Sequence, residues 1–251
     1  MADRIVQLSP DLWNVRGSFK VAKVVDIGTQ CTLVRRGSGS FVLLDAYTLT
    51  GEVLDQVMAL TEDGKRLEAV VNLHPFHTIH VKRTAERFPD ARQYGTRRHV
   101  AKAPDVNWEP EHSEDEALHV LFADDLQFTV PRGVDFVPAN ENLHFASVLA
   151  KHPASGVLHV DDTLMFNKLP LIGGLSFHPT LKQVLQPRAG AAAEFRAWCE
   201  ELVAFCEDVE QVCPAHIHLP PRAEPGAVAA DVRKVVAKAA KLLAAHEARH
   251  G

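Results

Sequence analysis

The first third of the chain alternates short apolar runs with turn residues, a pattern typical of β-strands. Gly28 and the run Gly37–Ser40 supply turns between these runs. The predicted strands are Arg4–Leu8, Leu12–Val15, Val21–Ile27, Cys31–Arg36 and Phe41–Asp45. A helix is predicted next over Gly51–Leu60, because its apolar residues repeat at helical spacing.

The middle of the chain joins a buried strand to a polar segment and then to a helix. Leu67–Asn72 is the predicted strand and Val81–Phe88 the predicted helix, with a histidine-rich segment between them. Ligands of α/β proteins commonly bind where a strand ends in such a loop. The Pro- and Glu-rich residues 101–116 are predicted to form a surface loop. Further strands are predicted near Gln93–Gly95, Leu118–Phe122, Gln127–Val130 and Asp135–Val137.

The last part of the chain begins with a predicted hairpin, whose strands are His144–Ala150 and Gly156–Asp161. Amphipathic helices are predicted over Ala191–Glu207 and from Pro225 to about His246, with a short strand at Val209–Cys213 between them. Strands with a helix therefore occur twice in succession. This order predicts one domain over residues 1–251 with two similar halves.

The composition is that of a globular protein able to bury a sizeable core, with 251 residues, 46% hydrophobic and 24% charged. A net charge of −5 and the lack of any Lys/Arg-rich run predict no nucleic-acid or membrane partner. No apolar stretch reaches the roughly 20 residues that span a bilayer, and no apolar run opens the chain. We therefore expect a cytoplasmic protein with a small-molecule substrate, and a homo-oligomer stays open.

The four cysteines are expected to be reduced and buried. They form no CxxC pair, and Cys199 and Cys206 would lie roughly 10 Å apart along one helix, beyond the reach of a disulfide. The stripes that contain Met58 and Trp198 are expected to be core.

Histidine and aspartate residues follow the ends of several predicted strands. Neutral imidazole and carboxylate are ligands suited to Zn²⁺, Fe or Mn. With 14 histidines in the chain, spacing alone also fits scattered surface residues. The groups are His74, His77 and His80; Asp161 and Asp162; His216 and His218; and His144 at a strand start.

In order and spacing these pieces resemble the metallo-β-lactamase superfamily. The first motif of that family reads His-x-His-x-Asp-His and is followed by a helix that ends near a Phe-Pro, here Phe88-Pro89. Counting back from that pair places Asn72, His74, Phe76 and His77 on the four ligand positions, so two are kept and two are replaced.

The later motifs of the family match too. His144 corresponds to the histidine that opens a hairpin, and Asp162 to the bridging aspartate at the end of the returning strand. His216 corresponds to the last ligand, although Ile217 replaces the usual glycine. Asp45 corresponds to the structural aspartate at an earlier strand end.

The resemblance implies an α+β fold, the αββα four-layer sandwich of the metallo-β-lactamase type, with a degenerate first metal motif. It implies one divalent metal, for which zinc is preferred and Fe or Mn are alternatives. If the register is off by a step, His80, Asp161 or His218 replaces a ligand. The implied ligands are His74, His77, His144, Asp162 and His216.

The function implied is a metal-dependent hydrolase acting on a small ester or thioester, in which a bound ion lowers the pKa of water to about 7. Asp162 would help to orient the water. Phe76 replaces the aspartate that handles protons in the family, so the general base is unassigned. Lys168 and His178 are candidates for substrate contact, because they lie in the Asn167–Lys182 insertion.

Two alternatives remain open. One is a non-catalytic binding protein on the same fold, and the other is a mononuclear iron oxidoreductase that uses two histidines and a carboxylate. The remaining histidines are expected on the surface: His99, His112, His119, His152 and His246.

Overall fold

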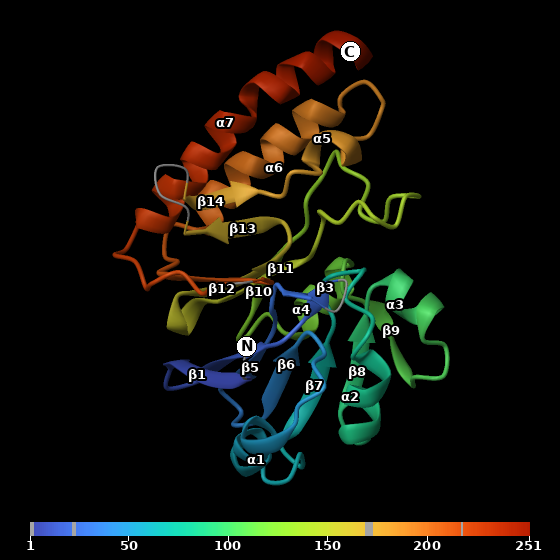
Figure 1. The fold of residues 1–251 in the computed structure, drawn as a ribbon, viewed down its shortest axis with the longest axis vertical. Helices are drawn as coiled ribbons and strands as arrows, with labels where there is room; N and C mark the ends of the chain where they lie inside the picture. Colours follow the sequence, from blue (N-terminus) through green and yellow to red (C-terminus); the bar gives the residue numbers. More distant parts are fainter. Residues whose placement is uncertain (1–2, 22–23, 169–172, 217) are drawn as a thin grey trace. The chain divides into compact units, whose positions relative to one another are not determined.

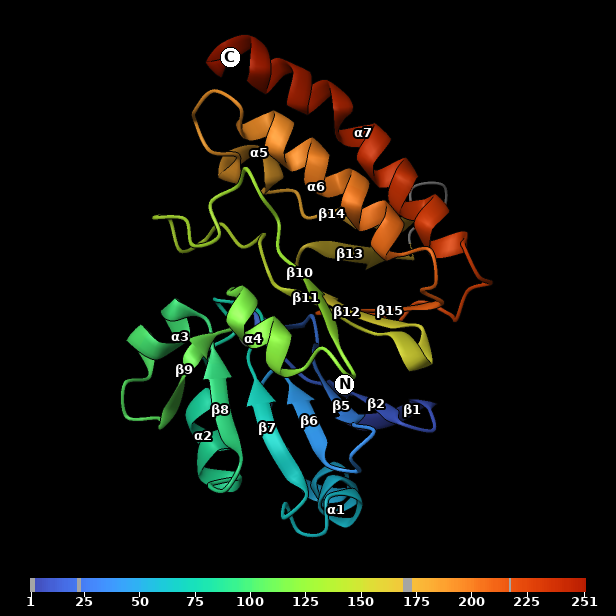
Figure 2. The ribbon, with the colours of Figure 1, turned by 180° about the vertical axis from the view of Figure 1, so that it is seen from behind.

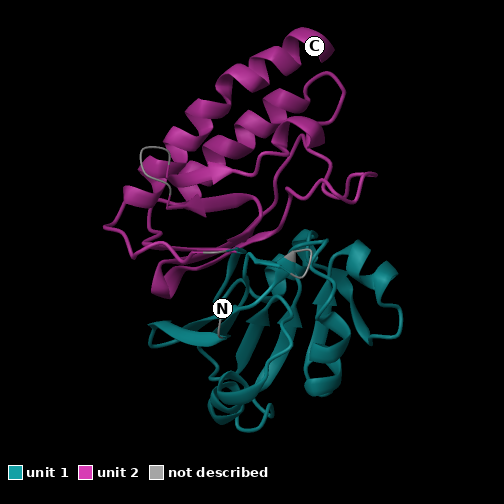
Figure 3. Cartoon of the chain, in the orientation of Figure 1, with its two compact units in different colours: residues 1–127, 215–217 teal, residues 128–214, 218–251 magenta. Residues whose placement is uncertain are grey.

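A computed structural model describes residues 3–21, 24–168, 173–216 and 218–251 (Figure 1). The chain divides into two compact units. The first contains residues 1–127 and 215–217, and the second contains residues 128–214 and 218–251 (Figure 3). The single domain predicted over 1–251 is not tested by this division and stays a prediction.

The first unit is built on a seven-stranded sheet of order β1-β2-β5-β6-β7-β8-β9. Its first four strands pair antiparallel, and the pairs from β6 to β9 are parallel. A separate two-stranded ribbon joins β3 to β4. The strands are β1 Arg4–Ser9, β2 Leu12–Gly17, β3 Lys20–Val21, β4 Val25–Asp26, β5 Thr29–Arg35, β6 Phe41–Leu44, β7 Leu67–Val71, β8 Arg92–Gly95 and β9 Trp108–His112.

Parallel pairing needs a crossover between consecutive strands, and helices provide it here. α1 (Gly51–Leu60) lies between β6 and β7, and it buries Val53 and Val57 against the core. α2 (Val81–Arg87) joins β7 to β8, α3 (Arg97–Lys102) joins β8 to β9, and α4 (Glu116–Leu121) follows. The loops after β6, β7 and β8 therefore open at the same edge of the sheet.

The second unit contains a four-stranded sheet of order β10-β11-β12-β15 and a hairpin of β13 with β14. The helices α6 and α7 lie side by side in both views (Figures 1 and 2). Their apolar faces form one core with Phe145, Phe195 and Trp198. The elements are β10 Gln127–Thr129, β11 Leu149–His152, a 3₁₀ turn Pro153–Ser155, β12 Val157–Asp161, β13 Leu164–Asn167, β14 Gly174–Phe177, α5 Leu181–Val184, α6 Ala191–Phe205, β15 Gln211–Pro214 and α7 Ala227–His250.

Most predicted elements are confirmed, and the errors have identifiable causes. Leu118–Phe122 was predicted as a strand but lies mostly in α4, since a short apolar run has no periodicity that separates helix from strand. The surface loop predicted over residues 101–116 is wrong in part, because Trp108–His112 forms the edge strand β9. No strand forms over Asp135–Val137, although the neighbouring Val134 makes a single bridge to Leu185.

The four cysteines are buried free thiols, as predicted, and Trp198 is fully buried in the core. Among the described residues, no helix combines the length and hydropathy that crossing a bilayer requires.

Candidate functional site

Asp45 and Asn72 fix the loop that follows β7 in the first unit. The Leu73 N–H donates to Asp45 Oδ1 at 2.7 Å, and Asp45 itself adopts a left-handed φ of 60°. Asn72 accepts from the Ala46 N–H at 3.1 Å and donates to the Tyr94 carbonyl at 3.0 Å. Both polar atoms of Asn72 therefore bond to the backbone, so this residue joins strands where the family has a ligand.

His74 and His77 lie together in this loop. Their rings stack with centroids 4.0 Å apart and an interplanar angle of 24°. His74 is fully buried, and its Nδ1 accepts from the Phe76 N–H at 3.2 Å. The loop therefore holds two neighbouring imidazoles at the carboxyl end of a parallel strand.

His216 belongs to the first unit, although it lies beyond β15 in the chain. Its Nδ1 lies 2.7 Å from the Gly28 carbonyl oxygen. A carbonyl can only accept, so Nδ1 carries the proton and the lone pair of the neutral ring is on Nε2. Histidines that bind metals typically donate their other ring N–H to a carbonyl or carboxylate in this way. The rings of His216 and His77 have centroids 6.0 Å apart, so the first unit gathers three imidazoles.

Phe76 stands where the family has an aspartate, and its ring lies under the Arg98 guanidinium. The guanidinium carbon is 4.3 Å from the ring centroid, and Arg98 also donates to the Pro75 carbonyl at 2.9 Å. A phenyl ring under a cation offers no ligand atom. Sequence reasoning missed Arg98, although it follows a strand end in the same way as the histidines do.

His99 was predicted on the surface and is fully buried. It forms a capping box at the start of α3, in which its Nδ1 accepts from the Thr96 N–H at 3.1 Å. Burial lowers the pKa of His99 to about 4, against the opposing effects of Asp45 and the backbone of His77. His152 is also buried rather than exposed, and its ring bonds to Ser155. Neither burial could be predicted, because it depends on a helix cap for His99 and on a turn contact for His152, and no apolar periodicity marks either.

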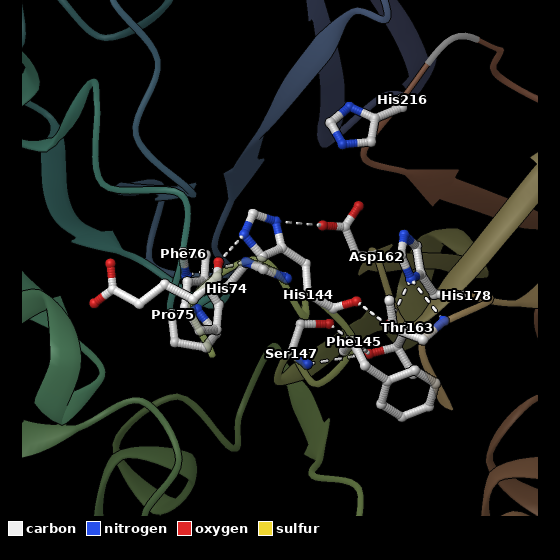
Figure 4. A network of polar contacts seen from close by, with 12 residues as sticks. His74, Pro75, Phe76, His144, Phe145, Ser147, Asp162, Thr163, His178 and His216 are labelled. Carbon is white, nitrogen blue, oxygen red and sulfur yellow. Dashed lines mark hydrogen bonds and ion pairs between the residues drawn. The ribbon is translucent and has the colours of Figure 1, made fainter. Parts of the chain in front are cut away.

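In the second unit, His144 and Asp162 face one another (Figure 4). His144 Nδ1 lies 3.9 Å from Asp162 Oδ2, and Asp162 is buried. His144 Nε2 lies 2.9 Å from the Glu141 carbonyl, so Nε2 carries the proton and Nδ1 the lone pair of the neutral ring. An imidazole lone pair thus faces a carboxylate oxygen, an arrangement that a cation stabilises. For comparison, two ligand atoms of one tetrahedral zinc ion lie about 3.3 Å apart, somewhat less than the 3.9 Å between these two atoms.

Hydrogen bonds hold the two segments that carry this pair. Thr163 Oγ1 donates to the Phe145 carbonyl at 2.9 Å, and the Ser147 N–H donates to Thr163 Oγ1 at 3.1 Å. These bonds join the residue after Asp162 to the residue after His144. The positions of both candidate ligands are therefore set by buried backbone contacts.

Three of the residues predicted as substitutes or substrate contacts have other partners nearby. His80 bonds to Thr48 at 2.8 Å, and burial lowers the pKa of His80. Asp161 pairs with His159 at 3.2 Å, with both side chains buried. His178 bonds to Thr180, which donates to the His144 carbonyl at 2.5 Å. His178 is therefore next to a candidate ligand, whereas Lys168 is exposed on the same insertion.

The five predicted ligands thus form two groups, each within one unit: His74, His77 and His216 in the first, and His144 and Asp162 in the second. The donors fit a divalent metal of the zinc type, since they are imidazoles and one carboxylate. Three of them, His74, His144 and His216, have one ring nitrogen held by a backbone group.

No protein-family model matches this chain. No curated protein matches it by sequence either.

Solved structures do resemble it over nearly its whole length. The metallo-β-lactamase DIM-1 exposed to ceftazidime has a TM-score of 0.63 at 12% identity, covering 95% of this chain and 98% of that one. FIM-1 from Pseudomonas aeruginosa in its mono-zinc form has a TM-score of 0.58 at 13% identity, covering 95% and 96%. A metallo-β-lactamase from Erythrobacter litoralis has a TM-score of 0.61 at 13% identity, covering 94% and 96%. These likenesses confirm the predicted fold, the αββα sandwich of metallo-β-lactamases.

Proposed function

We propose that this chain, which has the metallo-β-lactamase fold, is a metal-dependent hydrolase with a single divalent ion, preferably zinc. The ion would be held by His74, His77 and His216 of the first unit with His144 and Asp162 of the second. The observation that supports this most directly is the facing pair of His144 Nδ1 and Asp162 Oδ2, 3.9 Å apart. The likeness to FIM-1, which is described in a mono-zinc form, is compatible with one ion.

An ion at this position would supply a nucleophile, by lowering the pKa of a bound water to about 7. Asp162 would accept a hydrogen bond from that water and help to orient it. The Glu141 and Gly28 carbonyls hold one ring nitrogen each of His144 and His216, which would leave the other nitrogen of each ring available to bind an ion. With Phe76 in place of the family's aspartate, the first motif has no carboxylate to take up a proton, so slow turnover is expected. The substrate class we propose is a small ester or thioester.

A specific observation favours a second candidate, a binding protein without catalysis. Both polar atoms of the Asn72 side chain form hydrogen bonds with the backbone, and the Phe76 ring lies under Arg98. Two of the four positions of the first motif therefore provide no metal ligand. A chain that keeps the fold but loses half of this motif could retain a metal or ligand without turnover.

The two candidates are separated by metal content and activity measured together. The purified protein is analysed for Zn, Fe and Mn and is assayed with p-nitrophenyl acetate and a thioester, before and after removal of metal by a chelator. Near-stoichiometric zinc with chelator-sensitive hydrolysis supports the hydrolase. Stoichiometric metal without hydrolysis favours the binding protein. Stoichiometric iron favours the mononuclear iron oxidoreductase instead.

A matched pair of variants tests the ligands. His216→Ala should lose bound metal, whereas His112→Ala, which removes a histidine on the edge strand β9, should retain it. Equal metal content in the two variants would exclude His216 as a ligand.

A further inference from the structure

The second unit contains a groove whose lining includes none of the candidate metal ligands. It has a volume of about 670 Å³ and is lined by α5, the residues that follow it and the C-terminal half of α7. Figure 1 labels both helices in the second unit. Ligand pockets for small molecules commonly measure about 300–1,000 Å³. The groove is therefore large enough for a small organic ligand.

The charge of this groove is opposite to that of the whole chain. Its lining contains Lys182, Lys238, Lys241 and Arg249, with Asp135 as the one carboxylate. Within the described parts of the chain, none of these four cations forms an ion pair, whereas nearby cations such as Lys234 and Arg196 do. The chain as a whole has a net charge of −5. A local excess of unneutralised positive charge is stabilised by an anion.

The same groove has an apolar part and a buried polar atom. Leu185, Pro187 and Leu242 contribute apolar surface to its lining. His246 also lines it, and its Nε2 is buried with no hydrogen-bond partner among the described residues. A buried nitrogen without a hydrogen-bond partner is destabilising, and a ligand that bonds to it would remove this cost.

We propose that the α5–α7 groove binds a small amphipathic anion, with a phosphate or carboxylate head and an apolar body. The head lies among Lys238, Lys241 and Arg249, and the body packs on Leu185 and Leu242. None of these residues is among the proposed metal ligands, so binding does not require the proposed metal.

Isothermal titration calorimetry with the full chain tests this, with decyl phosphate, decanoate, inorganic phosphate and decanol as probes below their aggregation limits. Saturable 1:1 binding is expected for decyl phosphate or decanoate, and the tighter of the two identifies the head. Inorganic phosphate and decanol should bind at least about tenfold more weakly, because each satisfies only one part of the groove. Treatment with a chelator should leave the affinity unchanged.

Two double variants with the same change of charge provide the control. Lys238→Gln with Lys241→Gln should weaken binding about tenfold, since two charge-assisted contacts are lost. Lys20→Gln with Lys65→Gln removes two exposed positive charges of the first unit, neither of which lines the groove, and should change the affinity less than about twofold. The proposal is overturned if neither amphiphile saturates, if decanol binds as tightly as they do, or if both double variants lose the same affinity.

Discussion

His144 Nδ1 lies 3.9 Å from Asp162 Oδ2, and the opposite ring nitrogen of His144 donates to the Glu141 carbonyl. The imidazole is thereby committed to one tautomer, with its lone pair toward a buried carboxylate. Two electron-rich atoms in this position repel one another unless a proton or a metal ion lies between them. This relationship motivates the first prediction.

Replacing Asp162 with Asn should weaken zinc binding by at least about tenfold, because the amide keeps the shape of the side chain but loses its charge. The measurement is a competition titration of the metal-depleted protein with a zinc-sensitive chelator. Asp124→Asn, at an exposed position of the first unit, removes the same charge and should leave the zinc affinity unchanged. Unaltered zinc affinity in Asp162→Asn would remove that residue from the ligand set.

Replacing Asn72 with Ala should lower the free energy of unfolding by about 2–4 kcal/mol, since the Ala46 N–H and the Tyr94 carbonyl lose their buried partner. The number of zinc ions bound at saturation should not change, because Asn72 provides no ligand. Urea unfolding measures the first quantity and elemental analysis the second. Asn107→Ala, at an exposed position, should cost less than about 0.5 kcal/mol. Loss of the bound zinc in Asn72→Ala would show that Asn72 does more than join strands.

The buried His99 should make stability depend on pH. Its pKa is lowered to about 4 in the folded chain, from 6.5 when unfolded, so the folded state binds fewer protons between these values. The stability that neutral His99 contributes is therefore complete above pH 6.5 and is lost as the pH falls toward 4. The loss amounts to about 3 kcal/mol.

Urea unfolding at pH 7.5, 5.5 and 4.5, with a chelator present throughout, measures this effect. His99→Gln should reduce the decline by that amount because Gln does not titrate. An equal decline in the variant and the parent would assign the pH dependence to other groups.

Gly133 occupies a position where a side chain does not fit. Its φ is +72°, and a Cβ there would lie 2.0 Å from the Ala191 carbonyl oxygen, at the start of α6. Gly133→Ala should therefore cost about 3 kcal/mol of stability or more. Gly226→Ala is the matched control, since its φ of +79° is similar but no atom lies within 4 Å of the added Cβ. The control should cost about 1–2 kcal/mol, and a similar loss in both variants would show that backbone strain outweighs the clash.

The strands and long helices could be predicted from the sequence because their signal is periodic burial. Gly51–Leu60 was predicted with the observed bounds, and Ala191–Glu207 within two residues. The short α4 could not be distinguished from a strand, since its six residues are too few to show a helical period. The hairpin β13–β14 was missed because its strands have only four residues each, too few for a clear alternating pattern.

The candidate ligands could be named because strands that end in histidine or aspartate follow a known order. The residues that orient them could not be named. The Gly28 carbonyl that accepts from His216 is 188 positions away in the chain. Every residue has a backbone carbonyl, so no residue type in the sequence identifies this partner. His99 was assigned to the surface because its burial depends on a capping box, which the sequence shows only as Thr96 followed three residues later by a histidine.

Residues 215–217 belong to the first unit, while β15 before them and α7 after them belong to the second. A truncated protein that ends at residue 127 would therefore lack His216 and keep only two of the three imidazoles of its unit. No single cut in the chain separates the two units with all their own residues. Metal binding must consequently be studied on the intact polypeptide. A circularly permuted or split version would have to keep residues 215–217 with the first unit.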